Sequence, residues 1–289
     1  MSPTDVLELP PPWAPHPRRV RWFIPLVALA LSGCGGPDRH PTADFEALPS
    51  EGALRAGLLA RAARGEATAD LAHSIAASYW RTGDLDSTRL FLERAIALDP
   101  RHVDSLTWLS RLLYERGAIT EGLAVLEPAM RGWADPPPEV RVNRAVLEIA
   151  RGDLAAADSV LAACVTAHPT YAPAYGNLGY LELKLGRPAE AARRLRLAIA
   201  LDSTVAEFHN NLGIACREEL RFADSVTEFE RAVALNPGFA EAHYNLALVY
   251  KLYLSDDERA RLHFRRFLAL GGLPNQEVAE LFRREEAKR

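Results

Sequence analysis

The chain has 289 residues and a formal net charge of −4, with 48% hydrophobic and 25% charged residues. This composition is typical of a folded globular protein with enough apolar residues for a core. Because no basic segment stands out, the sequence argues against nucleic acid as a partner. It argues equally against binding to anionic lipid by charge alone.

The N-terminal region carries the pattern of an export signal. Three basic residues precede an apolar run at Trp22–Leu31, namely Arg18, Arg19 and Arg21. This run is too short for a membrane-spanning helix, which needs about 20 residues. A basic segment followed by a short apolar core is typical of a signal peptide.

The apolar run ends in the motif Leu31-Ser32-Gly33-Cys34, which resembles the bacterial lipobox. The resemblance implies that residues 1–33 are a lipoprotein signal peptide and that Cys34 is acylated as the membrane anchor. Gly35 stands where an aspartate would favour the inner membrane, so the resemblance implies the outer membrane and the periplasm. Residues 34–50 contain several glycines and prolines and are expected to form a flexible tether.

Beyond residue 68 the sequence is periodic. Asparagine recurs every 34 residues, at Asn143, Asn177, Asn211 and Asn245. Small residues keep nearly the same spacing, at Ala95, Ala129, Cys164, Ala198 and Ala232. A glycine column has the same period, at Gly83, Gly117, Gly152 and Gly186. A fixed period of this length indicates a stacked array of one supersecondary unit.

Each unit is predicted to be a pair of short helices. In residues 172–205, Gly186 separates a first helix from a second, in the position where a positive φ is tolerated. Ala191 and Ala198 supply the small side chains that let two helices approach closely.

This pattern resembles the tetratricopeptide repeat family. One unit matches it through Tyr175, Leu178-Gly179, Gly186, Ala191 and Ala198. The resemblance implies an all-α, right-handed superhelical solenoid of about six helix hairpins with a C-terminal capping helix. The expected organisation is a leading helix in 51–68, repeats over 69–274 and a capping helix in 275–289. The six units are expected at 69–102, 103–136, 138–171, 172–205, 206–239 and 240–274. In the last unit, Ser255 and Glu258 are predicted to form a capping box.

The sequence offers no catalytic constellation. It has no glycine-rich phosphate loop, no Cys-x-x-Cys and no His-Glu-x-x-His motif. His209 and His243 lie 34 residues apart, but they occupy a large apolar position of the family pattern and are predicted to be packed histidines. Cys164 and Cys216 are predicted to be buried small hydrophobes. We therefore expect no enzyme activity, no cofactor, no metal and no small-molecule substrate.

The resemblance places the first helix of each unit on the concave side of the superhelix. The four asparagines would then form a ladder, and an amide can pair with both N–H and C=O groups of an extended peptide. Neighbouring groove residues would add selectivity, and these are Tyr180, Lys184, Asn210, Arg217, Glu218, Tyr244 and Lys251. Of these, Lys184, Arg217 and Lys251 would favour a carboxylate or an acidic segment. Ser74 and Trp108 occupy the asparagine position in the first two units, and Trp108 is expected to end the ladder with an aromatic contact. The alternative is that the asparagines only bond across each helix pair.

The sequence thus predicts a lipid-anchored extracytoplasmic scaffold that binds a protein or peptide partner in a concave groove. By resemblance, envelope, secretion or pilus assembly are the expected settings. The alternative is a structural subunit or self-associating spacer of a larger envelope complex, which would interact through the convex face or the caps.

Overall fold

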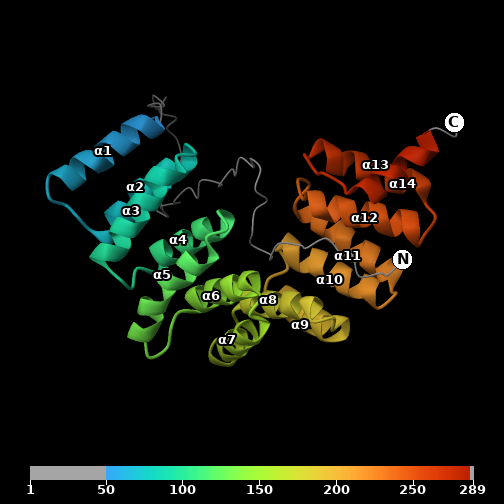
Figure 1. Ribbon diagram of the computed structural model, residues 1–289, viewed down its shortest axis with the longest axis horizontal. Helices are drawn as coiled ribbons and strands as arrows, with labels where there is room; N and C mark the ends of the chain where they lie inside the picture. Colours follow the sequence, from blue (N-terminus) through green and yellow to red (C-terminus); the bar gives the residue numbers. More distant parts are fainter. Residues whose placement is uncertain (1–49, 287–289) are drawn as a thin grey trace, which may run out of the picture. The chain divides into compact units, whose positions relative to one another are not determined.

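The computed structural model describes residues 50–286, and side chains as far as Arg283 (Figure 1). Within this range the chain forms fourteen α-helices and no strands, which confirms the predicted all-α helical-repeat solenoid. Cys34, the expected signal peptide and residues 34–49 of the tether lie outside the described residues. No helix in the described range is long and apolar enough to cross a membrane.

The helices fall into two compact units, which we describe separately. The N-terminal unit contains α1 (Glu51–Ala63), α2 (Ala69–Arg81), α3 (Leu85–Leu98) and α4 (Val103–Glu115). The C-terminal unit begins at Ala118. It contains α5 (Ile119–Gly132), α6 (Pro138–Arg151), α7 (Leu154–Ala167), α8 (Ala172–Lys184), α9 (Pro188–Leu201), α10 (Ala206–Glu218), α11 (Phe222–Leu235), α12 (Ala240–Leu252), α13 (Asp257–Ala269) and α14 (Gln276–Glu286).

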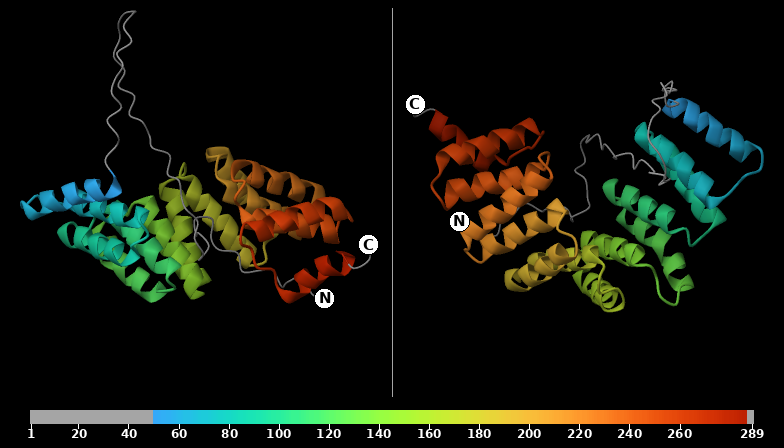
Figure 2. Two further views of the ribbon diagram at one scale, coloured as in Figure 1. Left: turned by 90° about the horizontal axis from the view of Figure 1, so that it is seen from above. Right: turned by 180° about the vertical axis from the view of Figure 1, so that it is seen from behind.

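In the C-terminal unit, successive helices pack as hairpins, and each hairpin packs on the next (Figures 1 and 2). The first helices of adjacent hairpins also touch, because α6 contacts α8, α8 contacts α10 and α10 contacts α12. We call the surface formed by α6, α8, α10 and α12 the first-helix face. A residue that recurs every 34 positions in these helices therefore recurs along one face of the unit.

Small residues create the crossing points inside each hairpin. A Cβ atom built on Gly213 of α10 would lie 2.6 Å from the ring of Phe229 in α11, so glycine is what lets the ring approach. In the preceding hairpin, Gly179 gives the same room to Leu195. The free cysteines Cys164 and Cys216 are both buried, as the sequence predicts.

The turns between paired helices use a left-handed residue. Gly83, Gly117, Gly152 and Gly186 adopt φ values from 70° to 88°, which confirms the role predicted for this glycine column. The α10–α11 turn departs from the pattern, because Leu220 takes a φ of 61° although it carries a side chain. Leu220 is also 71% exposed, so burial does not offset the strain of its backbone.

The predicted capping box at Ser255 and Glu258 is wrong. The N-cap of α13 is Asp256, whose side chain accepts a hydrogen bond from the backbone N–H of Arg259. Ser255 instead occupies the turn with a φ of 53°. The extra residue in this connection moves the cap one position along the chain, and Asp256 has the short carboxylate that an N-cap requires.

Candidate functional site

The first-helix face carries the asparagine row predicted from the sequence. Asn177, Asn211 and Asn245 come from α8, α10 and α12, and their exposed fractions are 1%, 3% and 4%. Asn143 of α6 is half-buried and makes an interaction of its own. Packing therefore fixes the positions of these three asparagines, whereas solvated side chains would be free to rotate.

Two of these amides bond within the unit. The Nδ2 of Asn177 donates to the carbonyl oxygen of Pro173 in its own helix at 2.8 Å. The Nδ2 of Asn245 donates to Oδ1 of Asn210 at 3.0 Å and so ties α12 to α10. Both bonds are structural, but neither crosses from the first to the second helix of its own hairpin, which is what the alternative interpretation expects.

Two other amide atoms have no partner among the described residues. Oδ1 of Asn177 and Nδ2 of Asn211 are buried and make no hydrogen bond there. Each such atom costs about 1–3 kcal/mol relative to a paired one. One is an acceptor and the other a donor, and they belong to neighbouring hairpins. Together they offer the two complementary groups that an extended peptide backbone requires.

Aromatic side chains flank the row. Tyr180 and Tyr244 are each 5% exposed, and burial raises the pKa of the Tyr244 hydroxyl although the charge of Arg217 opposes the shift. The ammonium group of Lys184 lies 5.8 Å from the centre of the Tyr180 ring. Two buried aromatic rings therefore accompany the amides on this part of the face.

The cations predicted to attract an acidic segment are mostly paired already. Arg217 lies 2.9 Å from a carboxylate oxygen of Glu218, and Lys251 lies 2.8 Å from one of Asp257. Burial, reinforced by the nearby charge of Glu241, raises the pKa of Glu207. Two of the three groove cations therefore already have an acidic partner.

Both recurring histidines are buried, as predicted, but each has a partner that the repeat pattern did not predict. Nδ1 of His209 lies 2.7 Å from a carboxylate oxygen of Glu228, and Nδ1 of His243 lies 3.0 Å from Nδ1 of His263. The partners sit on the second helix of the same hairpin, 19 and 20 residues later. This spacing of 19 or 20 residues is the sequence signal that could have identified both partners. No group of three or more metal-ligating side chains occurs in residues 50–286.

The N-terminal unit fills the asparagine position differently. The hydroxyl of Ser74 donates to the carbonyl of Asp70 at 2.8 Å and is exposed. The ring of Trp108 packs edge-on against His73 at 5.0 Å and against Trp80 at 5.8 Å. The aromatic contacts of Trp108 therefore lie within its own unit.

A serine, a histidine and an aspartate also meet in this unit. Nδ1 of His102 lies 2.9 Å from Oγ of Ser105, and its Nε2 lies 2.9 Å from Oδ1 of Asp70. Ser105 is fully buried, and its hydroxyl lies within hydrogen-bond distance of both His73 and His102. His102 also accepts the backbone N–H of Ser105 at the start of α4. The three residues thus cap α4 and link it to α2.

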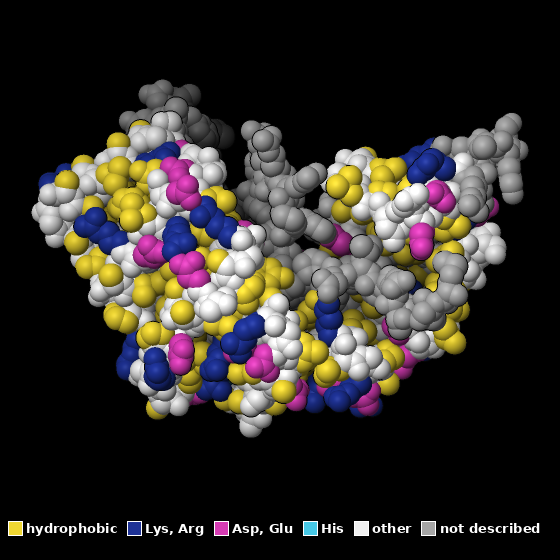
Figure 3. Space-filling view, viewed as in Figure 1, with side chains coloured by type: hydrophobic (Ala, Val, Ile, Leu, Met, Phe, Trp, Pro, Cys, Tyr) yellow, Lys and Arg dark blue, Asp and Glu magenta, His cyan; other side chains and the backbone are white. Residues whose placement is uncertain are grey.

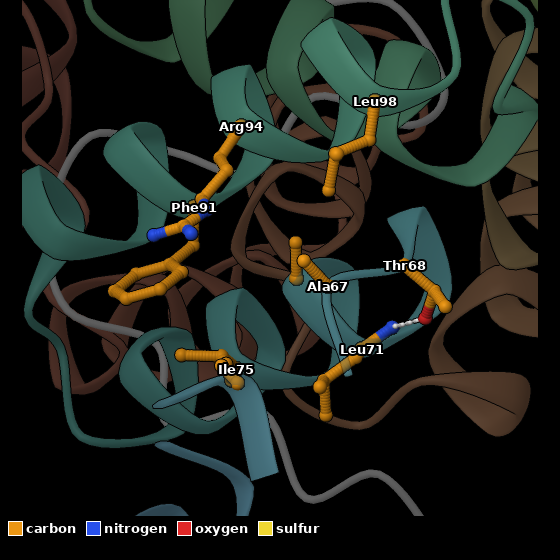
Figure 4. A pocket seen from close by; sticks show the side chains of 9 residues that line it. Ala67, Thr68, Leu71, Ile75, Phe91, Arg94 and Leu98 are labelled. Carbon is orange, nitrogen blue, oxygen red and sulfur yellow. Dashed lines mark hydrogen bonds between the residues drawn. The ribbon is translucent and has the colours of Figure 1, made fainter. Parts of the chain in front are cut away.

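The close-up in Figure 4 shows a small hollow in the N-terminal unit. Phe91, Arg94 and Leu98 of α3 face Leu71 and Ile75 of α2 across it. Its only drawn hydrogen bond is the helix cap from Leu71 N–H to Thr68, so its lining offers no convergent polar groups for a ligand.

These features define a helical-repeat solenoid, a class of protein whose generally non-catalytic fold supports binding of a protein or peptide partner. The tetratricopeptide repeat family model matches residues 74–136, 177–219 and 217–273. The chain belongs to the tetratricopeptide repeat family.

Solved structures with the same fold are similar at low identity. The anaphase-promoting complex hetero-tetramer Cut9–Hcn1 matches with a TM-score of 0.69 and 16% identity, over 81% of this chain and 46% of that one. The chain thus spans less than half of that protein. A thermophilic repeat protein of Thermus thermophilus matches with a TM-score of 0.56 and 20% identity, over 64% of this chain and 100% of that one. Pseudomonas aeruginosa PilF matches with a TM-score of 0.60 and 15% identity, over 78% and 100%. No curated protein matches the sequence.

Proposed function

We propose that this protein is a lipid-anchored extracytoplasmic scaffold that binds an extended protein segment along its first-helix face. The observation that carries the proposal is the pair of unpartnered amide atoms on Asn177 and Asn211 within the described part of the chain. A native fold rarely leaves buried polar atoms unpaired, and those that persist call for a physical reason. A bound backbone that donates to Asn177 and accepts from Asn211 supplies one. Because both amide atoms are shielded from solvent, the side chains that cover them must move aside when the segment binds.

The packing around the row supports this use. Asn177 is fixed through its own Nδ2, which leaves its Oδ1 in a defined place. The Asn245–Asn210 bond fixes the neighbouring position in the same way. Side chains that are already ordered lose little conformational entropy when a ligand binds. Because amides pair with the peptide backbone, this row would bind many sequences, and Tyr180 and Tyr244 would choose among side chains.

The cellular setting that we propose rests on the sequence motif that ends at Cys34. A lipid on this residue would hold the repeats at the bacterial outer membrane, facing the periplasm. Envelope, secretion or pilus assembly are the tasks that this placement favours. The likeness to PilF concerns the fold, and the choice of pathway stays a proposal.

A second candidate is a structural subunit or spacer that interacts through the turns or caps. Exposed apolar side chains at two adjacent turns favour it, because Leu220 and Leu252 are 71% and 52% exposed. Phe222 and Tyr253 stack between these turns with ring centres 4.2 Å apart. A partner on this edge would not touch the asparagine row.

The variant Asn211→Leu distinguishes a ligand-binding role of this amide from a structural role. If the amide serves a ligand, the variant loses the partner in crosslinking and affinity capture of the full-length tagged protein. The same variant should be more stable in thermal unfolding, since it removes an unpaired buried polar atom. The matched control, Asn245→Leu, breaks the bond to Asn210 and should destabilise the fold.

Capture by the triple variant Asn177→Ala/Asn211→Ala/Asn245→Ala, checked for folding by circular dichroism, completes the test. A partner that is lost only when these residues change assigns the first-helix face as the binding site. Retention of the partner by both the triple variant and Asn211→Leu would rule out this face in favour of the turns or caps. Detergent-phase partitioning of wild type and Cys34→Ser tests the lipid anchor independently.

A further inference from the structure

A hollow of about 260 Å³ lies at the C-terminal end of the chain, between α13 and α14. Its apolar lining includes Phe264 and Leu268 from α13 and Phe282 from α14. The rings of Phe264 and Phe282 stack with centres 4.0 Å apart and planes 6° apart. Leu268 is 43% exposed, so part of the lining is open to solvent. This volume is below the roughly 300–1,000 Å³ of drug-sized ligand pockets, and it suits a single large side chain.

Three arginines also line the hollow. Arg261 and Arg265 stand one turn apart on α13, and Arg283 comes from α14. None of the three forms an ion pair with a described residue. Arg259, two residues before Arg261, differs because its guanidinium pairs with the carboxylate of Asp256 at 2.6 Å. On α14, Glu280 accepts a hydrogen bond from Gln276.

This local charge opposes the charge of the whole chain, which is −4. On the face in Figure 3, basic and acidic side chains are interspersed, which is the ordinary arrangement of a protein surface. Three guanidinium groups around one apolar hollow repel each other when no described carboxylate pairs with them, and a ligand carboxylate would relieve that repulsion. Arginine is also the residue that binds carboxylates through two parallel hydrogen bonds.

We propose that this hollow is a second binding site, which takes an acidic protein segment that carries one large apolar residue. The apolar residue occupies the space beside Phe264, Phe282 and Leu268. Carboxylates on either side of it bind Arg261, Arg265 and Arg283. The small volume favours one side chain over the acyl chains of a lipid. This site is distinct from the first-helix face, where the cations are mostly paired.

The test uses the full chain and a fluorescent peptide with one phenylalanine between four aspartates. We expect saturable binding that weakens with salt, because the contacts are charged. Replacing the aspartates by asparagines, or the phenylalanine by alanine, should each weaken binding about tenfold or more. The variant Arg261→Gln/Arg265→Gln/Arg283→Gln should lose binding by a similar or larger factor.

Two further variants make the test specific. Arg194→Gln/Arg196→Gln/Arg231→Gln removes the same charge from exposed positions on α9 and α11 and should bind as wild type does. Ala279→Phe fills the hollow while keeping all three arginines, and it should lose the phenylalanine-dependent part of binding. Circular dichroism and thermal unfolding check that each variant is folded.

The outcomes distinguish a specific site from non-specific charge attraction and from a lipid surface. Equal loss in both triple-arginine variants would mean non-specific charge attraction and would overturn the proposal. Binding of phosphatidylglycerol vesicles without binding of the peptide would overturn it in favour of a lipid surface. Absence of peptide binding up to millimolar concentration would also reject it. The variant with alanine at positions 177, 211 and 245 should bind the peptide normally, so failure of the first-helix proposal leaves this result unchanged.

Discussion

The two units build the same helix hairpins but place different chemistry at the same repeat position. In the N-terminal unit this position holds Ser74, which is exposed, and Trp108, which packs on His73 and Trp80. In the C-terminal unit it holds the half-buried Asn143 and three asparagines that are almost fully buried, with two amide atoms left unpaired by the described residues. The small residues at the crossing points let the helices pack closely. The residue type at the asparagine position can therefore vary while the hairpin stays the same. Binding chemistry can therefore change along a repeat array without changing the fold.

The largest effect should come from the hairpin cores. Phe229 is fully buried against Gly213, so Phe229→Ala should lower the free energy of unfolding by about 3–5 kcal/mol. Leu92 in the N-terminal unit is equally buried, and Leu92→Ala should cost about 2–5 kcal/mol. Because repeats interact mainly with their neighbours, hydrogen exchange should rise most in the unit that carries the change. Equal increases in both units would show one cooperative unit and contradict the division.

The next effect distinguishes the asparagine position in the two units. Asn245→Ala leaves Oδ1 of Asn210 buried without its partner and should cost about 1–3 kcal/mol. Ser74→Ala removes only an exposed bond to its own helix and should stay within about 0.5 kcal/mol. Urea unfolding of both variants measures the difference. Similar costs at the two positions would mean that the amide row is no more structural than the serine.

Acid should affect the C-terminal unit more strongly. Burial lowers the pKa of both His243 and His263 below the usual 6.5, and for His263 the neighbouring His243 adds to the shift. Below about pH 6.5 the unfolded chain takes up protons that the folded chain does not, so stability falls as the pH falls. Among its described residues the N-terminal unit has one such group, His73, whose pKa burial also lowers.

Melting temperatures of wild type between pH 8 and pH 5 measure this loss of stability. The variant His243→Gln/His263→Gln should flatten the dependence more than His73→Gln does. A steeper fall in the double variant would show that the sign is wrong.

The smallest effect concerns the turn at Leu220. Glycine adopts the left-handed conformation without strain, and Leu220 loses little burial when it is removed. Leu220→Gly should therefore raise the free energy of unfolding by up to about 1 kcal/mol. Gly186→Leu, in the preceding hairpin, should lower it. Differential scanning calorimetry of both variants checks the pair, and destabilisation by Leu220→Gly would show that the leucine side chain makes a contact that matters.

The fold could be predicted because a fixed period constrains every hairpin in the same way. The glycine column has the positive φ that the sequence predicts, and Cys164 is buried in the column where small residues recur. The partners of individual polar side chains could not be predicted. Whether Asn245 bonds to Asn210 or Asn177 bonds to Pro173 depends on side-chain geometry within a hairpin, and both positions look alike in the sequence.

The repeat pattern predicts least where the chain is irregular. The extra residue before α13 moves the N-cap from Ser255 to Asp256, because a period gives no guidance at an insertion. The pairing of Arg217 and Lys251 with acidic neighbours could not be predicted either, since it depends on rotamers as well as on spacing. The arginines around the hollow at α13 and α14 lie outside the repeating pattern of the first helices, and periodicity alone does not single them out.

The stacked rings of Phe264 and Phe282 have a consequence for how such a protein changes in length during evolution. Phe282 of α14 covers an apolar end of α13 that a further hairpin would otherwise cover. Because α14 covers this surface, hairpins inside the array can be duplicated without changing the packing of α13 on α14. An extra 34-residue segment inserted between α11 and α12 would meet the surfaces of an ordinary hairpin on both sides. The number of hairpins could thus change by whole units while α14 still packs on α13.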